Sequence, residues 1–223
     1  TVYYSTISDN TVTIATVSYS GGGGIYNTGS LTVNYSTISD NTANGGYDYG
    51  GGIYNKGSLT VNHSTISDNT ANGGDRGLGG GIYNDGSATM TVSNSTISYN
   101  TAKSRTFGYG GGICNDRNAT ATVSNSTISY NTAKGGAFAF GFGGGIYNGT
   151  SATMTVSNST ISYNTANGGS SFGGGIYNAG TATVSNSTIS DNTANGSSNG
   201  FGGGIYNNGK LTVYYSTISD NTV

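Results

Sequence analysis

Residues 79–102 read Gly-Gly-Gly-Ile-Tyr-Asn-Asp-Gly-Ser-Ala-Thr-Met-Thr-Val-Ser-Asn-Ser-Thr-Ile-Ser-Tyr-Asn-Thr-Ala, and close copies of this stretch fill most of the 223-residue chain. The tetrapeptide Ser-Thr-Ile-Ser recurs eight times, 28 to 33 residues apart. Gly-Gly-Gly-Ile-Tyr-Asn occurs once per period, with Cys114 in place of tyrosine in the fourth copy. A threonine-valine pair recurs between these two motifs. A fixed period of this length indicates a solenoid.

Each period is rich in Gly, Asn, Ser and Thr and has no 3.6-residue apolar period, which excludes helical repeats. Apolar and polar residues alternate in Leu31-Thr32-Val33 and in Met90-Thr91-Val92-Ser93, as in strands with one buried face. We therefore predict an all-β fold, a single-stranded right-handed parallel β-helix (β-solenoid) of about seven coils with three short strands per coil. The single domain covers 1–223, and its coils start near the glycine triplets at 22, 50, 79, 110, 143, 173 and 202. At about 4.8 Å per coil the rod is roughly 34 Å long.

Stacking of equivalent residues predicts columns along the rod. The interior holds two isoleucine columns, a valine column and an alanine column, which bury apolar area without a globular core. Asparagine recurs at two bends, where it tolerates left-handed geometry and its amides can bond along the stack. The predicted structural ladder comprises Asn41, Asn69, Asn100, Asn131, Asn164 and Asn192, and a second series runs through Asn27, Asn55, Asn84, Asn115, Asn148, Asn178 and Asn207.

The unit Ile97-Ser98-Tyr99-Asn100-Thr101-Ala102, followed by a glycine-rich segment and Gly110-Gly111-Gly112-Ile113, resembles repeats of bacterial secreted right-handed β-helix proteins. It is also similar to the GGA(I/L) and FxxN repeats of the polymorphic outer-membrane protein family, although isoleucine stands here where that family has phenylalanine. The resemblance covers nearly the whole chain and implies a β-helix located outside the cell or on its surface, in families made up largely of adhesins, passengers and surface proteins.

The two ends of the sequence match, because residues 1–12 and 212–223 are the same twelve residues. Neither end shows the helix, proline or charged unit that caps a monomeric solenoid. We expect either head-to-tail stacking into a homopolymer, or one 211-residue super-repeat within a longer chain; both predict a fibre. The expected end-to-end interface comprises Val2, Tyr3, Tyr4, Ile7, Asn10, Val213, Tyr214, Tyr215, Ile218 and Asn221.

Head-to-tail stacking would place carboxylates from two copies close together. Asp9 and Asp40 of one copy would approach Asp191 and Asp220 of the next. Because like charges one strand apart repel, a hard cation such as Ca²⁺ at the joint is one hypothesis. The alternative is a solvated acidic strip, and no other metal or cofactor is expected.

The segments before the glycine triplets hold all six phenylalanines and several tyrosines. This aromatic loop strip either docks a glycan or a neighbouring protofilament, or covers a sheet face. It consists of Tyr49, Tyr109, Phe138, Phe140, Phe142, Phe172 and Phe201. The tyrosines that follow each triplet should form an outward ladder. Nearby basic residues form a weak patch, which we interpret as a solvated edge. They are Arg76, Lys103, Arg105 and Lys134.

The central coils depart from the repeat. The loops at 85–89, 116–120 and 149–153 have five residues where the other coils have three. In parallel, Tyr99, Tyr130 and Tyr163 replace the aspartate that follows Ile-Ser elsewhere. The middle of the rod is therefore specialised.

Composition limits the remaining functions. A net charge of −2 and the lack of a long apolar run argue against binding nucleic acid and against membrane insertion. The chain has nine aspartates, no glutamate and one histidine, and we expect no cluster of Asp with Lys or Arg on one sheet face. We therefore predict a non-enzymatic structural protein, extracellular or on the cell surface, that self-associates and that has a glycan or another surface component as a further partner. The alternatives are a carbohydrate-active β-helix enzyme, a glycan-binding adhesin passenger, or an ice-binding surface built on the threonines from Thr32 to Thr212.

Overall fold

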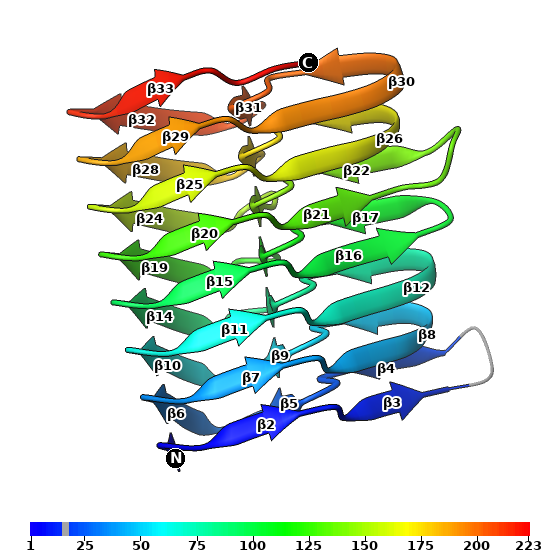
Figure 1. Ribbon diagram of the computed structural model, residues 1–223, viewed down its shortest axis with the longest axis vertical. Coiled ribbons are helices and arrows are strands. Elements are labelled where there is room, and N and C mark those ends of the chain that lie inside the picture. The colour runs from blue at the N-terminus through cyan, green and yellow to red at the C-terminus, as the bar shows by residue number, and fades with distance from the viewer. Residues whose placement is uncertain (15–17) are drawn as a thin grey trace.

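A computed structural model describes residues 1–14 and 18–223 and shows a parallel β-helix that rises one coil at a time (Figure 1). The N-terminus lies at one end of the rod and the C-terminus at the other, and the chain turns in the right-handed sense. Every strand pair is parallel and joins a residue to its counterpart in the neighbouring coil, as in Ile66↔Ile97. Within the described residues, no helix has the length and apolar character needed to cross a bilayer.

Four sheets run along the rod. Sheet A comprises β1 (Val2–Tyr3), β6 (Ser30–Asn34), β10 (Ser58–Asn62), β14 (Thr89–Ser93), β19 (Thr120–Ser124), β24 (Thr153–Ser157), β28 (Thr181–Ser185) and β32 (Lys210–Tyr214). Sheet B comprises β2 (Thr6–Ser8), β7 (Thr37–Ser39), β11 (Thr65–Ser67), β15 (Thr96–Ser98), β20 (Thr127–Ser129), β25 (Thr160–Ser162), β29 (Thr188–Ser190) and β33 (Thr217–Ser219). Sheet D comprises β5 (Ile25–Asn27), β9 (Ile53–Asn55), β13 (Ile82–Asn84), β18 (Ile113–Asn115), β23 (Ile146–Asn148), β27 (Ile176–Asn178) and β31 (Ile205–Asn207).

Sheet C is formed by the segment of variable length between sheets B and D. It comprises β3 (Thr11–Thr13), β4 (Tyr19–Gly21), β8 (Thr42–Tyr49), β12 (Thr70–Leu78), β16 (Thr101–Ser104), β17 (Phe107–Tyr109), β21 (Thr132–Lys134), β22 (Phe140–Phe142), β26 (Thr165–Phe172) and β30 (Thr193–Phe201). From β8 onward this segment runs outward and returns in every coil, so it forms an arch beside the core (Figure 1). Some coils make the arch from one bent strand and others from two, and β12 accordingly pairs with both β16 and β17.

The prediction of three strands per coil was therefore wrong, because the segment expected to be a loop forms a fourth sheet. Its glycines permit this. The two halves of each arch lie so close that a Cβ on Gly77 would come within 2.7 Å of the Ala71 carbonyl oxygen, and one on Gly141 within 2.7 Å of the Ala133 carbonyl oxygen. Small residues let the halves pack against each other, and pairing with the next arch satisfies their backbones.

The hydrophobic core lies between sheets A, B and D. Isoleucines of sheets B and D face valines and Leu, Met or Ala residues of sheet A, and in the inner coils these side chains are at most 2% exposed. These columns match the predicted stacks. The alanine column lies beside the core, at the start of sheet C.

The asparagine ladder is confirmed, and it is buried. Along the series, each amide nitrogen donates to the amide oxygen of the next coil at 2.9–3.0 Å, as Asn100 does to Asn131. A second ladder runs beside sheet D, where Asn84 donates to Asn115 at 2.8 Å. Neither ladder has left-handed backbone, contrary to expectation. The positive φ angles at these corners belong to the residue before the first ladder, such as Asp68 (φ 58°) and Tyr99 (φ 58°).

Candidate functional site

The tyrosines of sheet D point away from the isoleucine core and enter a second apolar cluster. There Tyr54, Tyr83 and Cys114 pack against Tyr49 and Leu78 from the returning half of sheet C. Tyr83 and Cys114 are fully buried. The tyrosine ladder is thus outward of the main core, as expected, but it is covered in the central coils.

Most of the aromatic loop strip lies over this tyrosine ladder. Tyr109, Phe142, Phe172 and Phe201 stack in successive coils with ring centroids 5.1–5.3 Å apart, and they continue the column that contains Tyr49. Several of these rings meet the sheet D tyrosines edge-on. This packing corresponds to the alternative in which the aromatic loop strip covers a sheet face. The other strip residues lie outside the column. Phe140, two residues before Phe142, stacks beside the Phe142 ring, and Phe138 is 99% exposed at the tip of its arch.

The covering column is interrupted in the first coil, where Gly21 pairs with Tyr49 and supplies no side chain. A Cβ on Gly21 would lie 2.5 Å from the Tyr54 ring, so the ring partly occupies the space that a side chain would need. Next to this position lies a cleft of about 550 Å³. Its lining includes Tyr19, Tyr26, Tyr49, Tyr54, Lys56, Asp85 and Arg117.

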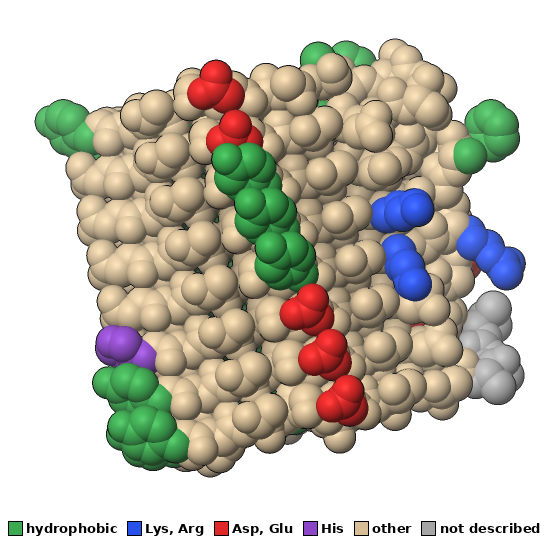
Figure 2. Space-filling model, in the orientation of Figure 1, with side chains coloured by type: hydrophobic (Ala, Val, Ile, Leu, Met, Phe, Trp, Pro, Cys, Tyr) green, Lys and Arg blue, Asp and Glu red, His purple; other side chains and the backbone are tan. Residues whose placement is uncertain are grey.

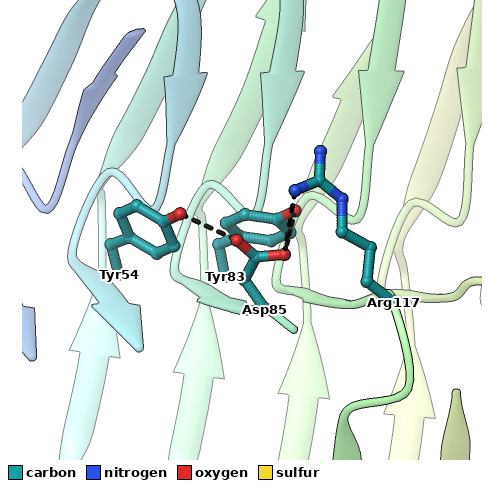
Figure 3. Close-up of polar contacts among 4 residues, drawn as sticks. All are labelled: Tyr54, Tyr83, Asp85 and Arg117. Carbon is teal, nitrogen blue, oxygen red and sulfur yellow. Dashed lines mark hydrogen bonds and ion pairs between the residues drawn. The ribbon is translucent and has the colours of Figure 1, made fainter. Parts of the chain in front are cut away.

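Asp85 is the polar centre of this cleft (Figure 3). Its carboxylate is almost fully buried and accepts hydrogen bonds from the hydroxyl groups of Tyr54 (2.8 Å) and Tyr83 (3.0 Å). The Arg117 guanidinium, which is largely exposed, lies 3.6 Å from the same carboxylate. Within the described residues no other ion pair is formed. Two neutral donors and one cation offset the desolvation of the charge.

The enlarged loops position these groups. In each, the N–H of the fourth residue donates to the carbonyl of the first, as Ala88 does to Asp85 (3.3 Å) and Ala119 to Asp116 (3.2 Å). Arg117 takes a left-handed conformation (φ 54°) in its turn. Its side chain reaches from there to Asp85 in the preceding coil (Figure 3).

A second carboxylate, Asp116, occupies the same turn position one coil further on. Burial raises the pKa of Asp116, and hydrogen bonding and charge from Arg117 oppose that rise. Its oxygen lies over Gly149, where a Cβ would come within 2.0 Å. Asp116 also lines a small cavity of about 70 Å³ beside Arg76, Tyr109 and Tyr147. Burial likewise raises the pKa of the Cys114 thiol nearby.

We expected no cluster of Asp with Lys or Arg on one sheet face, and the cluster found here lies in the turns that follow the strands of sheet D. Two aspartates of unlike surroundings, Asp85 and Asp116, lie on successive coils with Lys56 and Arg117 close by. Such a pair can divide acid and base roles or bind a polyhydroxylated ligand. Sequence reasoning missed these contacts, although both aspartates open enlarged loops, which depart from the repeat.

The predicted acidic residues lie on another part of the surface. Asp9, Asp40, Asp191 and Asp220 occupy the corner between sheets B and C, in a strip whose middle is Tyr99, Tyr130 and Tyr163 (Figure 2). Ring centroids in that tyrosine stack are 5.0 Å apart, and the rings are about half exposed. Within the described residues no three His, Cys or Asp side chains form a group that could hold a metal. The cation predicted between copies stays a prediction.

The predicted end-to-end interface lies at the two ends of the rod. Val2, Tyr3, Tyr4, Ile7 and Asn10 belong to the first coil, and Val213, Tyr214, Tyr215, Ile218 and Asn221 belong to the last. The identical segments thus form edge strands of the same two sheets, β1 and β2 at one end and β32 and β33 at the other. Ile218 is 50% exposed, whereas Ile189 beneath it is fully buried.

Comparison with known families supports the geometry. Residues 2–161 match the family model of the right handed beta helix region. No curated protein and no solved structure gives a significant match.

Proposed function

This chain belongs to the right-handed β-helix family, and on that premise we propose that it is a non-enzymatic structural rod of the cell surface or extracellular space. In this proposal it acts as a subunit or segment of a fibre that grows along the rod axis. The observation that supports it best is the repetition of sheets A, B and D in register along the described rod. Columns of residues at equivalent positions in the repeat, and two asparagine ladders, continue from one end coil to the other.

The buried polar groups favour a mechanical role. No buried side-chain nitrogen or oxygen among the described residues lacks a hydrogen-bond partner, and most partners come from the adjacent coil. Satisfied polar networks rigidify a structure, and each coil here is tied to both of its neighbours. A rod of this kind resists bending and local opening.

The end coils supply the surfaces for assembly. Inner coils bury their isoleucines and valines fully, but Val213 and Ile218 are 37% and 50% exposed. Edge strands with unpaired backbone groups accept another strand readily. A second copy can place β1 and β2 on β32 and β33 and continue the valine and isoleucine columns of sheets A and B.

This joint has a definite geometry. The last coil passes through sheets A and B and then reaches Thr222, which bridges to Thr193 at the start of sheet C. When β1 pairs with β32, sheets A and B are continuous, whereas sheets C and D are interrupted by the absence of one strand layer. A further stretch of chain would close that gap. The gap therefore distinguishes stacked copies from a continuous super-repeat.

Sedimentation and light scattering on the wild-type chain and two variants test assembly. Ile218→Asp places a charge in the end face, and Tyr163→Asp places the same charge on the side of the rod, where Asp191 already stands one coil away. We expect fibres from the wild type and from Tyr163→Asp, and short species from Ile218→Asp. A wild-type chain that stays monomeric at high concentration, or fibres unaffected by Ile218→Asp, would refute the proposal.

A second candidate function is carbohydrate binding or cleavage at the Asp85 cleft. It is favoured by the Asp85 carboxylate and the tyrosine rings that line the cleft, and by a second carboxylate, Asp116, at the same turn position one coil further on and in different surroundings. Incubation with a panel of polysaccharides, followed by reducing-end measurement, tests cleavage, and calorimetry tests binding. Loss of cleavage or of binding in Asp85→Asn and in Asp116→Asn would support this candidate. The absence of both binding and cleavage for every polysaccharide in the panel would remove it.

A further inference from the structure

A second groove, distinct from the Asp85 cleft, runs along the outside of the arches. It has a volume of about 550 Å³ and is lined by residues of four successive coils, from Asn44 and Gly45 to Gly135 and Gly136. Four coils span about 14 Å along the axis at the strand spacing. The length of the groove suits a linear ligand that lies parallel to the rod.

The groove is cationic in a chain of net negative charge. Lys103, Arg105 and Lys134 line it, and none of the nine aspartates does. Lysine and arginine side chains gather on this side of the rod, over β16 and β21 (Figure 2). No described carboxylate lies within ion-pair distance of these three side chains.

The two lysines replace asparagines of the repeat. Equivalent positions in the flanking coils are Asn72 and Asn167, which pair in register with Lys103 and Lys134 respectively. On the N-terminal side, where asparagine is kept in two successive coils, Asn72 donates to Asn44 at 3.0 Å. The substitution thus gives up amide bonding and sets two cations side by side, since Lys103 pairs directly with Lys134. Like charges directly opposite in a sheet are destabilising, so folding does not account for them.

The arch tips leave room for a ligand above these charges. The Arg105 N–H donates to the Gly74 carbonyl (3.1 Å), and the Gly136 N–H donates to the Arg105 carbonyl (3.2 Å). Glycine therefore flanks Arg105 in both neighbouring coils, and Arg105 is exposed. Arginine binds carboxylate and sulfate groups through two parallel N–H donors, and lysine adds point charges.

We propose that this groove, defined by Lys103, Arg105 and Lys134, binds an anionic polysaccharide with carboxylate or sulfate groups along a linear chain. The lysines are one strand apart, so successive anionic units meet successive cations. A bound anion between them relieves the repulsion of the pair. The proposal does not depend on fibre assembly or on the Asp85 cleft.

Binding of the full chain to dextran sulfate, polygalacturonate and neutral dextran tests this assignment, and the first two probes separate sulfate from carboxylate. Lys103→Asn/Lys134→Asn restores the repeat residue at both positions, so this variant should fold. Lys210→Thr is the control for loss of a lysine, because threonine stands at the paired position 181. We expect at least one anionic polymer to bind, with affinity reduced roughly fivefold or more in the double variant and little changed in Lys210→Thr.

Three results would overturn the proposal. They are no binding of either anionic polymer, an equal loss of affinity in Lys210→Thr and in the double variant, and equal binding of neutral dextran. Single-stranded DNA that binds as tightly as the best polysaccharide would overturn the assignment to glycans. Circular dichroism of each variant separates loss of binding from loss of fold.

Discussion

Replacement of Asn131 by alanine tests how much the buried amide ladder stabilises the rod. The Asn131 amide donates to the Ile97 carbonyl (2.9 Å) and to the Asn164 amide oxygen (3.0 Å). Its own oxygen accepts from the backbone N–H and the side-chain amide of Asn100, both at 3.0 Å. All these groups lie in fully buried residues.

The expected loss follows from the groups left without partners. Alanine leaves two Asn100 donors without an acceptor, and each buried unsatisfied donor costs about 1–3 kcal/mol. We expect Asn131→Ala to lower the free energy of unfolding by about 2–6 kcal/mol, a large share of the about 5–15 kcal/mol typical of a domain.

Asn10→Ala is the matched control, because Asn10 belongs to the same ladder but lies exposed in the end coil. It donates to Asn41 at 2.9 Å, and no described residue donates to its side-chain oxygen. Its loss should cost about 0.5–1.5 kcal/mol. Guanidinium denaturation followed by far-ultraviolet circular dichroism compares the two variants, and hydrogen exchange at the Asn100 N–H locates the damage. Equal destabilisation by the two variants would refute the account of the ladder.

Three further predictions concern single sites. Burial raises the pKa of Asp116, so its contribution to stability is full below about pH 4 and is lost as the pH rises through the raised pKa. Asp116→Asn should therefore flatten this pH dependence of stability and be neutral or stabilising at pH 7. Urea unfolding midpoints that fall by the same amount in the variant at pH 4 and at pH 7 would contradict this prediction. Cys114 is fully buried and its thiol pKa is raised, so a thiol reagent should react with it only after denaturation. Rapid reaction with the folded chain would show that Cys114 is not packed as described. Gly111→Ala puts a Cβ 2.4 Å from the Gly144 carbonyl oxygen and should cost about 3 kcal/mol or more, whereas Gly29→Ala meets nothing within 4 Å and should cost less than about 0.5 kcal/mol; similar melting temperatures would argue against the close coil contact.

The columns of the rod could be predicted from the sequence because the repeat leaves little freedom. When Ile66, Ile97 and Ile128 recur at one phase, stacking each coil on its copy fixes their register, and the strand pairs follow. The asparagine ladder follows in the same way. Local propensity alone would not have placed Asn131 in a fully buried position.

Sheet C could not be predicted, because its strands owe little to intrinsic preference. Gly45 pairs with Gly73 in the arch, although glycine is a poor strand residue. The pairing arises because the preceding strands fix where each arch begins, and its neighbour then satisfies the backbone. A register shift between Gly73 and Arg76 absorbs the difference in arch length.

The contacts of the Asp85 cleft were also beyond prediction. They join Tyr54 to Asp85 across one coil and Asp85 to Arg117 across the next. These contacts depend on the turn conformation of the enlarged loops, including the positive φ of Arg117, which composition does not reveal. The sequence could still indicate where to look, since the loops depart from the repeat.

The central claim is that the coils form a rod that extends along its own axis. Electron microscopy of the assembled chain, with layer spacing measured along the fibre, tests it most directly. The account predicts unbranched fibres one rod wide with a continuous axial repeat of about 4.8 Å in sheets A and B. Isolated particles of roughly 34 Å at all concentrations, or fibres whose strands run parallel to the fibre axis, would contradict it.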